Sequence, residues 1–407
     1  MIPLEYISEI LSNYNFLYTY LITLLSIFIF NKLIFNKVIN GLYLLNFTSS
    51  IVFAVIIDLY VKNYITTQKL FFFAISEVFL FIVVVLIYKQ LIKNANREKL
   101  RLALHIFNNK YFILLIVFLL LSVAMNAINV VNDGSSRIAF NVNKWYSIIR
   151  VINTLLRPTI AMILFFNIES KNKVKSVVIF LLLVLESVTA GSRAGFLFFL
   201  IGYYLVYVDI FDAKVFVKKS SKYLALLTLT VFAIFTLMYN NLSVLHTFER
   251  LVHYGESTIM VYPLNEPTSV VNGHSMISKI HRGFGRLFGD STSNDIDTLF
   301  GYALSAKFYG ANTLTGPNAR IGSYALTVFP GGKILLLYLI FFGYLRFCFH
   351  LLKSSRNISP EYYIISLLLI LDGIQQFIFD YNTGMSILTV IIILLVSRMT
   401  KVFLVHR

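Results

Sequence analysis

Long apolar runs, each of about 18 residues or more, recur along almost the whole chain and are separated by short polar connections. A helix of that length crosses the hydrocarbon core of a bilayer. Hydrophobic residues make up 58% of the 407 residues and charged residues 13%, which is too apolar for a soluble globular protein. The pattern therefore predicts an all-α, polytopic integral membrane protein.

About eleven transmembrane helices are expected. Their approximate positions are 14–31, 38–61, 70–88, 111–131, 148–168, 176–190, 195–211, 223–240, 325–345, 361–379 and 385–403. The count is open between ten and twelve because of Met1–Leu11 and the break Phe329-Pro330-Gly331-Gly332. This gives three regions: residues 1–240 with eight spans, one large loop at 241–324, and residues 325–407 with three spans.

The charge of the connections predicts the orientation. On one side the connections carry 19 Lys and Arg residues, over 31–37, 93–110, 169–175, 212–222, 351–360 and 398–407. On the other side the short connections carry 5, over 62–69, 132–147, 191–194 and 380–384. The richer side is expected to be cytoplasmic, with the C-terminus inside and the large loop outside. This bias also explains the net charge of +16 without nucleic-acid binding.

The large loop is the most polar part of the chain and holds four of its seven histidines. His274, His281, Arg282 and Arg286 fall within one short stretch with Lys279. Cationic groups beside the membrane suit a lipid-linked phosphate, and histidine supplies an acid or base near neutral pH. The alternative is a basic patch that binds lipid headgroups.

Two further arginines are expected to reach the same space. Arg320 lies in a turn-rich approach to the ninth span, 315–322. Arg193 lies at the tip of the tight connection Glu186–Gly195, where its guanidinium can present a planar fork to a phosphate. The alternative for Arg193 is that it anchors a helix hairpin at the headgroups.

Arg157 lies in the middle of an expected span, directly before Pro158. A charge at that depth costs a few kcal/mol on insertion scales (about 2.5–3.5), so it is a functional candidate by default. The spacing places it on one polar face with Arg150 and Asn153. The alternative is a structural ion pair with Glu186 or Asp372.

No metal or cofactor is predicted. The chain has one cysteine, Cys348, which excludes an internal disulfide and a multi-cysteine metal site. Asp295-Ile296-Asp297 has the form of a metal-binding pair, but a solvated turn is the preferred interpretation. His-Glu-x-x-His and phosphate-loop sequences do not occur.

The chain resembles the O-antigen polymerase (Wzy) family of bacterial inner-membrane proteins. The resemblance rests on the number of spans, the dominant loop in the second half, the turn Gly191-Ser192-Arg193, and the approach from Thr315-Gly316-Pro317 to Gly331-Gly332. His274-Ser275 and Gly285 also follow a pattern of the related O-antigen ligases, except that Phe288 replaces its last member.

The resemblance implies a metal-independent glycosyltransferase of lipopolysaccharide biosynthesis that faces the periplasm. Donor and acceptor would both be glycans on undecaprenyl pyrophosphate, and a chain-length regulator protein is a candidate partner beside the membrane lipids. His274 would be the base, with His281 second. The cationic clamp for the pyrophosphate would be Arg157, Arg193, Arg282, Arg286 and Arg320. The alternative functions are an O-antigen ligase and a flippase of lipid-linked sugars.

Overall fold

The computed structural model describes residues 14–133, 144–189, 193–212, 253–265, 320–328 and 334–379, with isolated positions within 5–9, 304–308 and 387–395. These residues form helices joined by short connections, and no strand occurs among them. The predicted all-α class is confirmed for this part of the chain.

The first three predicted spans are helices in the structure. Their bounds are Tyr14–Phe35 (α2), Tyr43–Val61 (α3), and one rod of Thr67–Phe73 (α4), a π-helical segment Ala74–Phe79, and Leu80–Lys93 (α5). Thr66 caps the rod, because its side-chain oxygen accepts a hydrogen bond from the Lys69 N–H. The π-helical segment was not expected, and it lies in the interior of the span.

A short amphipathic helix precedes the fourth span. α6 (Arg97–Asn109) meets α7 (Phe112–Asp133) at a bend of 72°. α6 buries Leu100, Leu104 and Phe107 at helical spacing and turns polar side chains outward. Such a helix at a sharp bend is typical of a segment that lies in the membrane surface.

Three helices follow at the predicted fifth to seventh spans: α8 (Lys144–Glu169), α9 (Lys173–Thr189) and α10 (Arg193–Phe211). The turn between α8 and α9 is tight, and Lys171 takes a left-handed backbone conformation there (φ 61°). α8 continues through Pro158, which lies inside it.

The described helices of the last part are α13 (Glu256–Val261), α16 (Ile321–Val328), α17 (Ile334–Ser355) and α18 (Pro360–Phe379). Residues 329–333, which fall inside the predicted span 325–345, lie outside the described residues, so the continuity of this span stays a prediction. Pro330 and two glycines fall in that interval, and both residue types interrupt helices.

Five of the described helices are long and apolar enough to cross a membrane, or six if the bent pair α6–α7 counts as one span. The chain is therefore a multi-pass helical membrane protein. The predicted spans at 223–240 and 385–403 lie outside the continuously described residues. The count of eleven stays a prediction.

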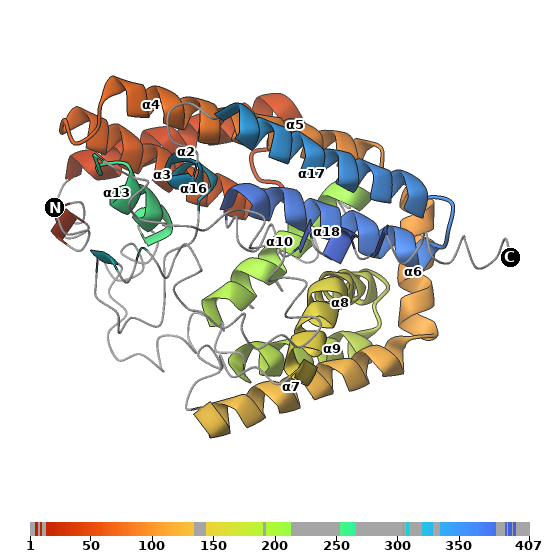
Figure 1. The fold of residues 1–407 in the computed structure, drawn as a ribbon. Coiled ribbons are helices and arrows are strands. Elements are labelled where there is room, and N and C mark those ends of the chain that lie inside the picture. Colours follow the sequence, from red (N-terminus) through yellow and green to blue (C-terminus); the bar gives the residue numbers. More distant parts are fainter. Residues whose placement is uncertain are drawn as a thin grey trace, which may run out of the picture.

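The helices form two layers with a pair between them (Figure 1). α2, α3, α4, α5 and α17 lie together, and α7, α8 and α9 lie on the other side. α10 and α18 contact helices of both layers. Side chains that the two layers bring together therefore meet around α10 and α18.

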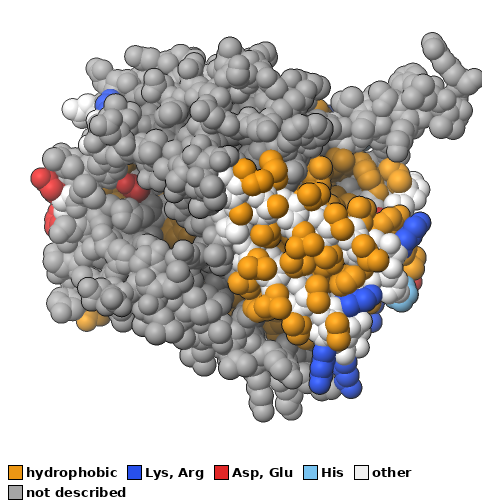
Figure 2. Space-filling model, turned by 90° about the horizontal axis from the view of Figure 1, so that it is seen from below, with side chains coloured by type: hydrophobic (Ala, Val, Ile, Leu, Met, Phe, Trp, Pro, Cys, Tyr) orange, Lys and Arg blue, Asp and Glu red, His pale blue; other side chains and the backbone are white. Residues whose placement is uncertain are grey.

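In the described part of the face drawn in Figure 2, apolar side chains form a broad surface. Large apolar side chains are exposed on α7 and α9, among them Ile113 and Val174. Lys and Arg side chains gather at one edge of this face (Figure 2). An apolar belt bounded by basic residues is typical of a lipid-facing surface.

Candidate functional site

Arg157 lies in the middle of α8, and its guanidinium is held by the two following helices. Its Nη2 lies 3.3 Å from Oε2 of Glu186 on α9. Its guanidinium carbon lies 4.5 Å from the ring centroid of Phe199 on α10, which is a cation–π contact. The ion pair with Glu186, one of the two interpretations offered by the sequence, is present.

A second carboxylate approaches from α18. Asp372 accepts a hydrogen bond from Gln376 and interacts electrostatically with Arg157. Tyr203, one turn beyond Phe199 on α10, interacts with both charged groups. Four helices thus converge on one group of side chains, the Arg157 cluster: Arg157, Glu186, Phe199, Tyr203 and Asp372.

The Arg157 cluster is partly open. The Arg157 side chain is 24% exposed, whereas that of Glu186 is 3% exposed. Nε of Arg157 is buried and has no hydrogen-bond partner among the described residues. A guanidinium with an unused N–H can donate a hydrogen bond to a phosphate or carboxylate oxygen of a ligand. Among the described residues, two carboxylates, Glu186 and Asp372, face this one guanidinium.

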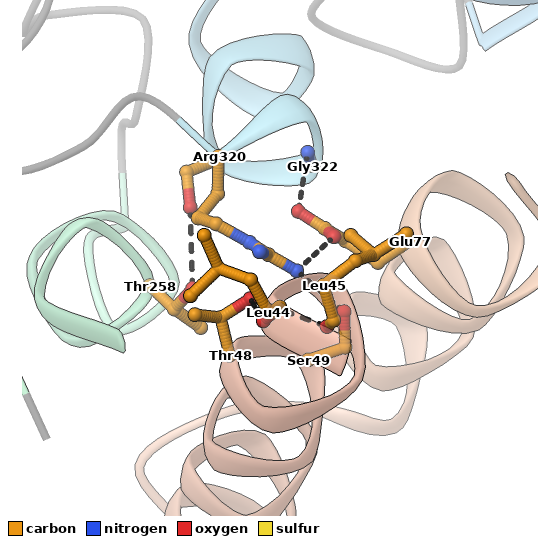
Figure 3. A network of polar contacts seen from close by, with 9 residues as sticks. Leu44, Leu45, Thr48, Ser49, Glu77, Thr258, Arg320 and Gly322 are labelled. Atoms are coloured by element: carbon orange, nitrogen blue, oxygen red, sulfur yellow. Dashed lines mark hydrogen bonds and ion pairs between the residues drawn. The ribbon is translucent and has the colours of Figure 1, made fainter. Parts of the chain in front are cut away.

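Arg320 forms the second cluster, and it is fully closed (Figure 3). Its side chain is 0% exposed, and its Nη2 lies 3.0 Å from Oε2 of Glu77, itself 1% exposed. The same Nη2 donates to Oγ of Ser49 on α3 at 3.3 Å. The N–H of Gly322 donates to Oε1 of Glu77 at 2.9 Å, so both carboxylate oxygens have partners. We call Arg320, Glu77, Ser49 and Gly322 the Arg320 cluster.

The π-helical segment carries Glu77, and residues of α16 and α17 pack closely against this segment. Tyr338 of α17 donates to the carbonyl of Ile75 at 3.1 Å. A Cβ on Gly322 would come within 2.6 Å of Cγ of Glu77, so only glycine fits there. Burial, with the Glu77 carboxylate nearby, raises the pKa of the Tyr262 hydroxyl well above its ordinary value. Single π-turns inside helices occur often at functional sites.

The geometry of Arg320 leaves little room for a ligand. Both hydrogen bonds of the Arg320 side chain, to Ser49 and to Glu77, come from Nη2. A guanidinium binds a phosphate through two neighbouring N–H groups, either those of Nη1 and Nη2 or those of Nε and Nη2. Both pairs include Nη2, so neither pair is free in Arg320. Nε and Nη1 have no hydrogen-bond partner among the described residues. In this conformation Arg320 therefore joins α16 to α3 and to the π-helical segment.

The structure describes only some of the predicted site residues. It places Arg157 and Arg320 in separate clusters that share no partner among the described contacts. Arg193 is the first residue of α10, and its side chain is not described. His274, His281, Arg282 and Arg286 lie outside the described residues, as does the pair Asp295 and Asp297. Their roles stay predictions.

Sequence reasoning missed several partners. Glu77 is a charged residue inside the predicted span 70–88, but nothing in the sequence connects it with Arg320, which is far along the chain. Phe199 and Tyr203 were also missed. Their spacing of four residues on an apolar helix was the available signal, because it places both rings on one face.

No group of three metal-ligating side chains occurs among the described residues. Comparison of the chain with family models, with curated proteins and with solved structures finds no match.

Proposed function

We propose that the protein is an O-antigen polymerase, or a polymerase of a similar surface polysaccharide, in a bacterial inner membrane. In this proposal the donor is a growing glycan on undecaprenyl pyrophosphate, and the acceptor is one repeat unit on a second such carrier. An acceptor hydroxyl oxygen bonds to the anomeric carbon of the donor. The bond from that carbon to the pyrophosphate breaks, undecaprenyl pyrophosphate leaves, and the hydroxyl proton passes to a base.

The observation that carries the proposal is the Arg157 cluster. A partly exposed guanidinium is held between α8, α9 and α10 of an apolar helical protein, with one donor unused. A pyrophosphate leaving group gains charge as its bond to the sugar breaks. A cation fixed in position stabilises that charge most where water is excluded. Arg157 is thus suited to take the role that a divalent ion plays in other transferases.

The remaining predicted residues complete the proposed site. Arg193 begins α10, the helix whose Phe199 ring supports Arg157. Arg193, Arg282 and Arg286 are assigned to the pyrophosphate and the sugars, and His274 or His281 to proton transfer. Arg320 joins this clamp only if a ligand phosphate displaces Glu77 from its Nη2. No metal or cofactor takes part.

The orientation follows from the same proposal. The basic edge in Figure 2 is assigned to the cytoplasmic side, in line with the charge of the connections. The C-terminus is then cytoplasmic. α9 ends at Thr189 and α10 begins at Arg193, so Glu186 and Phe199 lie toward the opposite, periplasmic side, where the lipid-linked glycans are joined.

The lipopolysaccharide of a deletion strain tests the proposal. A polymerase mutant adds a single repeat unit to the lipid A core, and plasmid-borne wild-type protein restores the ladder. A ligase or flippase mutant adds no repeat unit at all. Core without any repeat unit in the deletion strain would replace the polymerase by one of these two functions.

Arg193→Ala and Arg157→Ala sharpen the test at the level of residues. Both variants should give the single-repeat pattern at normal protein level. Arg193→Lys should not restore the ladder, because an ammonium group cannot reproduce the planar fork of a guanidinium. Full-length ladders from Arg193→Ala would remove Arg193 from the site.

A further inference from the structure

The Arg157 cluster holds more negative than positive side chains. Glu186 from α9 and Asp372 from α18 both face Arg157, and no second Lys or Arg interacts with Asp372 among the described residues. Inside a membrane protein, a carboxylate in excess of the available cations is costly and marks a group that takes up a proton or binds a ligand. The question is which of the two carboxylates has this role.

The contacts of the two carboxylates differ. Glu186 is 3.3 Å from the guanidinium of Arg157 and forms an ion pair with it. The hydrogen-bond donor of Asp372 is the neutral amide of Gln376. The titratable or charged groups that interact with Asp372 from other helices are Arg157 of α8, Tyr203 of α10 and Tyr344 of α17. Among the described contacts, Glu186 is thus committed to holding Arg157, whereas Asp372 makes its hydrogen bond to a neutral group.

The position of Asp372 suits transfer to a substrate. It lies about two turns before the end of α18 at Phe379, on the end of the bundle where α9 and α10 meet. The cation that it faces is the one that is 24% exposed and has an unused donor. A ligand that reaches Arg157 thus comes close to Asp372.

We propose that Asp372 is the proton acceptor of the glycosyl transfer. This inference rests on the proposed function. Asp372 takes the proton of the acceptor hydroxyl as its oxygen bonds to the anomeric carbon, while the electron pair of the breaking bond leaves with undecaprenyl pyrophosphate on Arg157. Glu186 keeps Arg157 in place and is a positioning residue. His274 and His281 are then not required for this step.

The test uses the purified full-length protein in lipid nanodiscs. The probe is the pool of lipid-linked repeat units extracted from the deletion strain, and the readout is the rate at which a ladder forms. Asp372→Asn should lower the maximal rate by about 100-fold or more, the range for loss of a positioned base, with little change in KM. Glu361→Gln is the matched control, because it makes the same chemical change at the other end of α18 and should keep the wild-type rate.

The pH profile separates proton transfer from a structural role. The wild-type rate should fall at low pH as Asp372 becomes protonated, and this fall should be absent in Asp372→Asn. Asp372→Glu should keep the fall with a reduced rate. If Asp372→Asn does not fold, Asp372→Glu decides, and a wild-type rate and profile in that variant overturns the proposal.

The two proposals fail in different ways. If the wild-type protein leaves the extracted repeat units unjoined, the polymerase function and this inference fall together. If the wild-type protein joins them and Asp372→Asn does so at more than a tenth of its rate, only the role of Asp372 is overturned. If His274→Ala is inactive and Asp372→Asn keeps the wild-type pH profile, Asp372 is not the base, and the base is assigned to His274 in the large loop.

Discussion

Two arginines lie inside the same apolar bundle, yet their surroundings differ. Arg320 is 0% exposed and paired with Glu77, whose two oxygens are both bonded. Arg157 is 24% exposed, lies on the ring of Phe199, and faces two carboxylates. Counted over the described side chains, the Arg320 cluster is balanced in charge and closed, whereas the Arg157 cluster has one more carboxylate than cations and is partly exposed.

The difference separates two roles of a buried charge, a structural role and a role in binding or proton transfer. A closed and balanced pair joins segments that are distant in the chain, here α16 to α3 and to the π-helical segment. An open and unbalanced cluster has interactions left over for a ligand or a proton. If this distinction holds, substitutions in the Arg320 cluster should act on stability, and substitutions in the Arg157 cluster on activity.

The largest effect is expected from breaking the Arg320 pair. Glu77→Gln or Arg320→Ala leaves the other member without its partner, and breaking a buried ion pair costs about 3–5 kcal/mol. Thermal unfolding in detergent and the amount of protein in the membrane measure this loss. The double variant Glu77→Gln/Arg320→Met should recover much of it, because no buried charge is left unpaired. A double variant as unstable as either single one would contradict the pairing.

Arg157→Ala should have the next largest effect, and mainly on activity. Loss of a fixed cation beside the developing charge should lower the rate by about 100-fold, or about 2.7 kcal/mol. The ladder assay measures the rate, and thermal unfolding is the companion measurement. The midpoint should move less than in Arg320→Ala, since the Arg157 side chain is already partly exposed. An equal loss of stability in both variants would show that the two clusters have the same structural role.

The sequence predicted the helices better than the contacts. Apolar runs of span length placed α2, α3 and α18 close to their observed bounds, because burial in a bilayer leaves a long and unmixed apolar signal. The connection before the fourth span contained a helix that we had not expected, α6, whose apolar face is only part of its surface. A window that averages hydrophobicity misses such a face.

The pairing of charges was only partly predictable. Arg157 and Glu186 were expected as one alternative, because both are expensive inside neighbouring spans and each needs a partner. The partner of Arg320 was not predicted, since it depends on how α16 packs against a π-helical segment formed much earlier in the chain. Long-range packing of this kind has no local signature.

A smaller effect on stability is expected from Gly322→Ala. The new Cβ would lie 2.6 Å from Cγ of Glu77 and 2.8 Å from the Tyr262 hydroxyl oxygen, so the Arg320 cluster must shift. Overpacking of this kind costs about 1–3 kcal/mol. Gly343→Ala is the control, because a Cβ there meets nothing within 4 Å. Because position 343 is inside a helix, Gly343→Ala should leave the free energy of unfolding unchanged or raise it by up to about 1 kcal/mol. Equal unfolding midpoints of the two variants would show that the cluster is not tightly packed.

The smallest effect is expected from Phe199→Leu, which removes the ring beneath Arg157 and keeps an apolar side chain. A cation–π contact at a partly exposed site contributes about 0.5–1 kcal/mol. The rate of ladder formation should therefore fall by a few-fold, because Arg157 keeps Glu186 but loses its orientation against α10. Phe53→Leu, which alters a ring packed against Phe73 and Phe81 and not a member of the Arg157 cluster, should leave the rate unchanged. If both variants slow the reaction equally, general packing of the bundle explains the loss, and the open character of the Arg157 cluster loses its support.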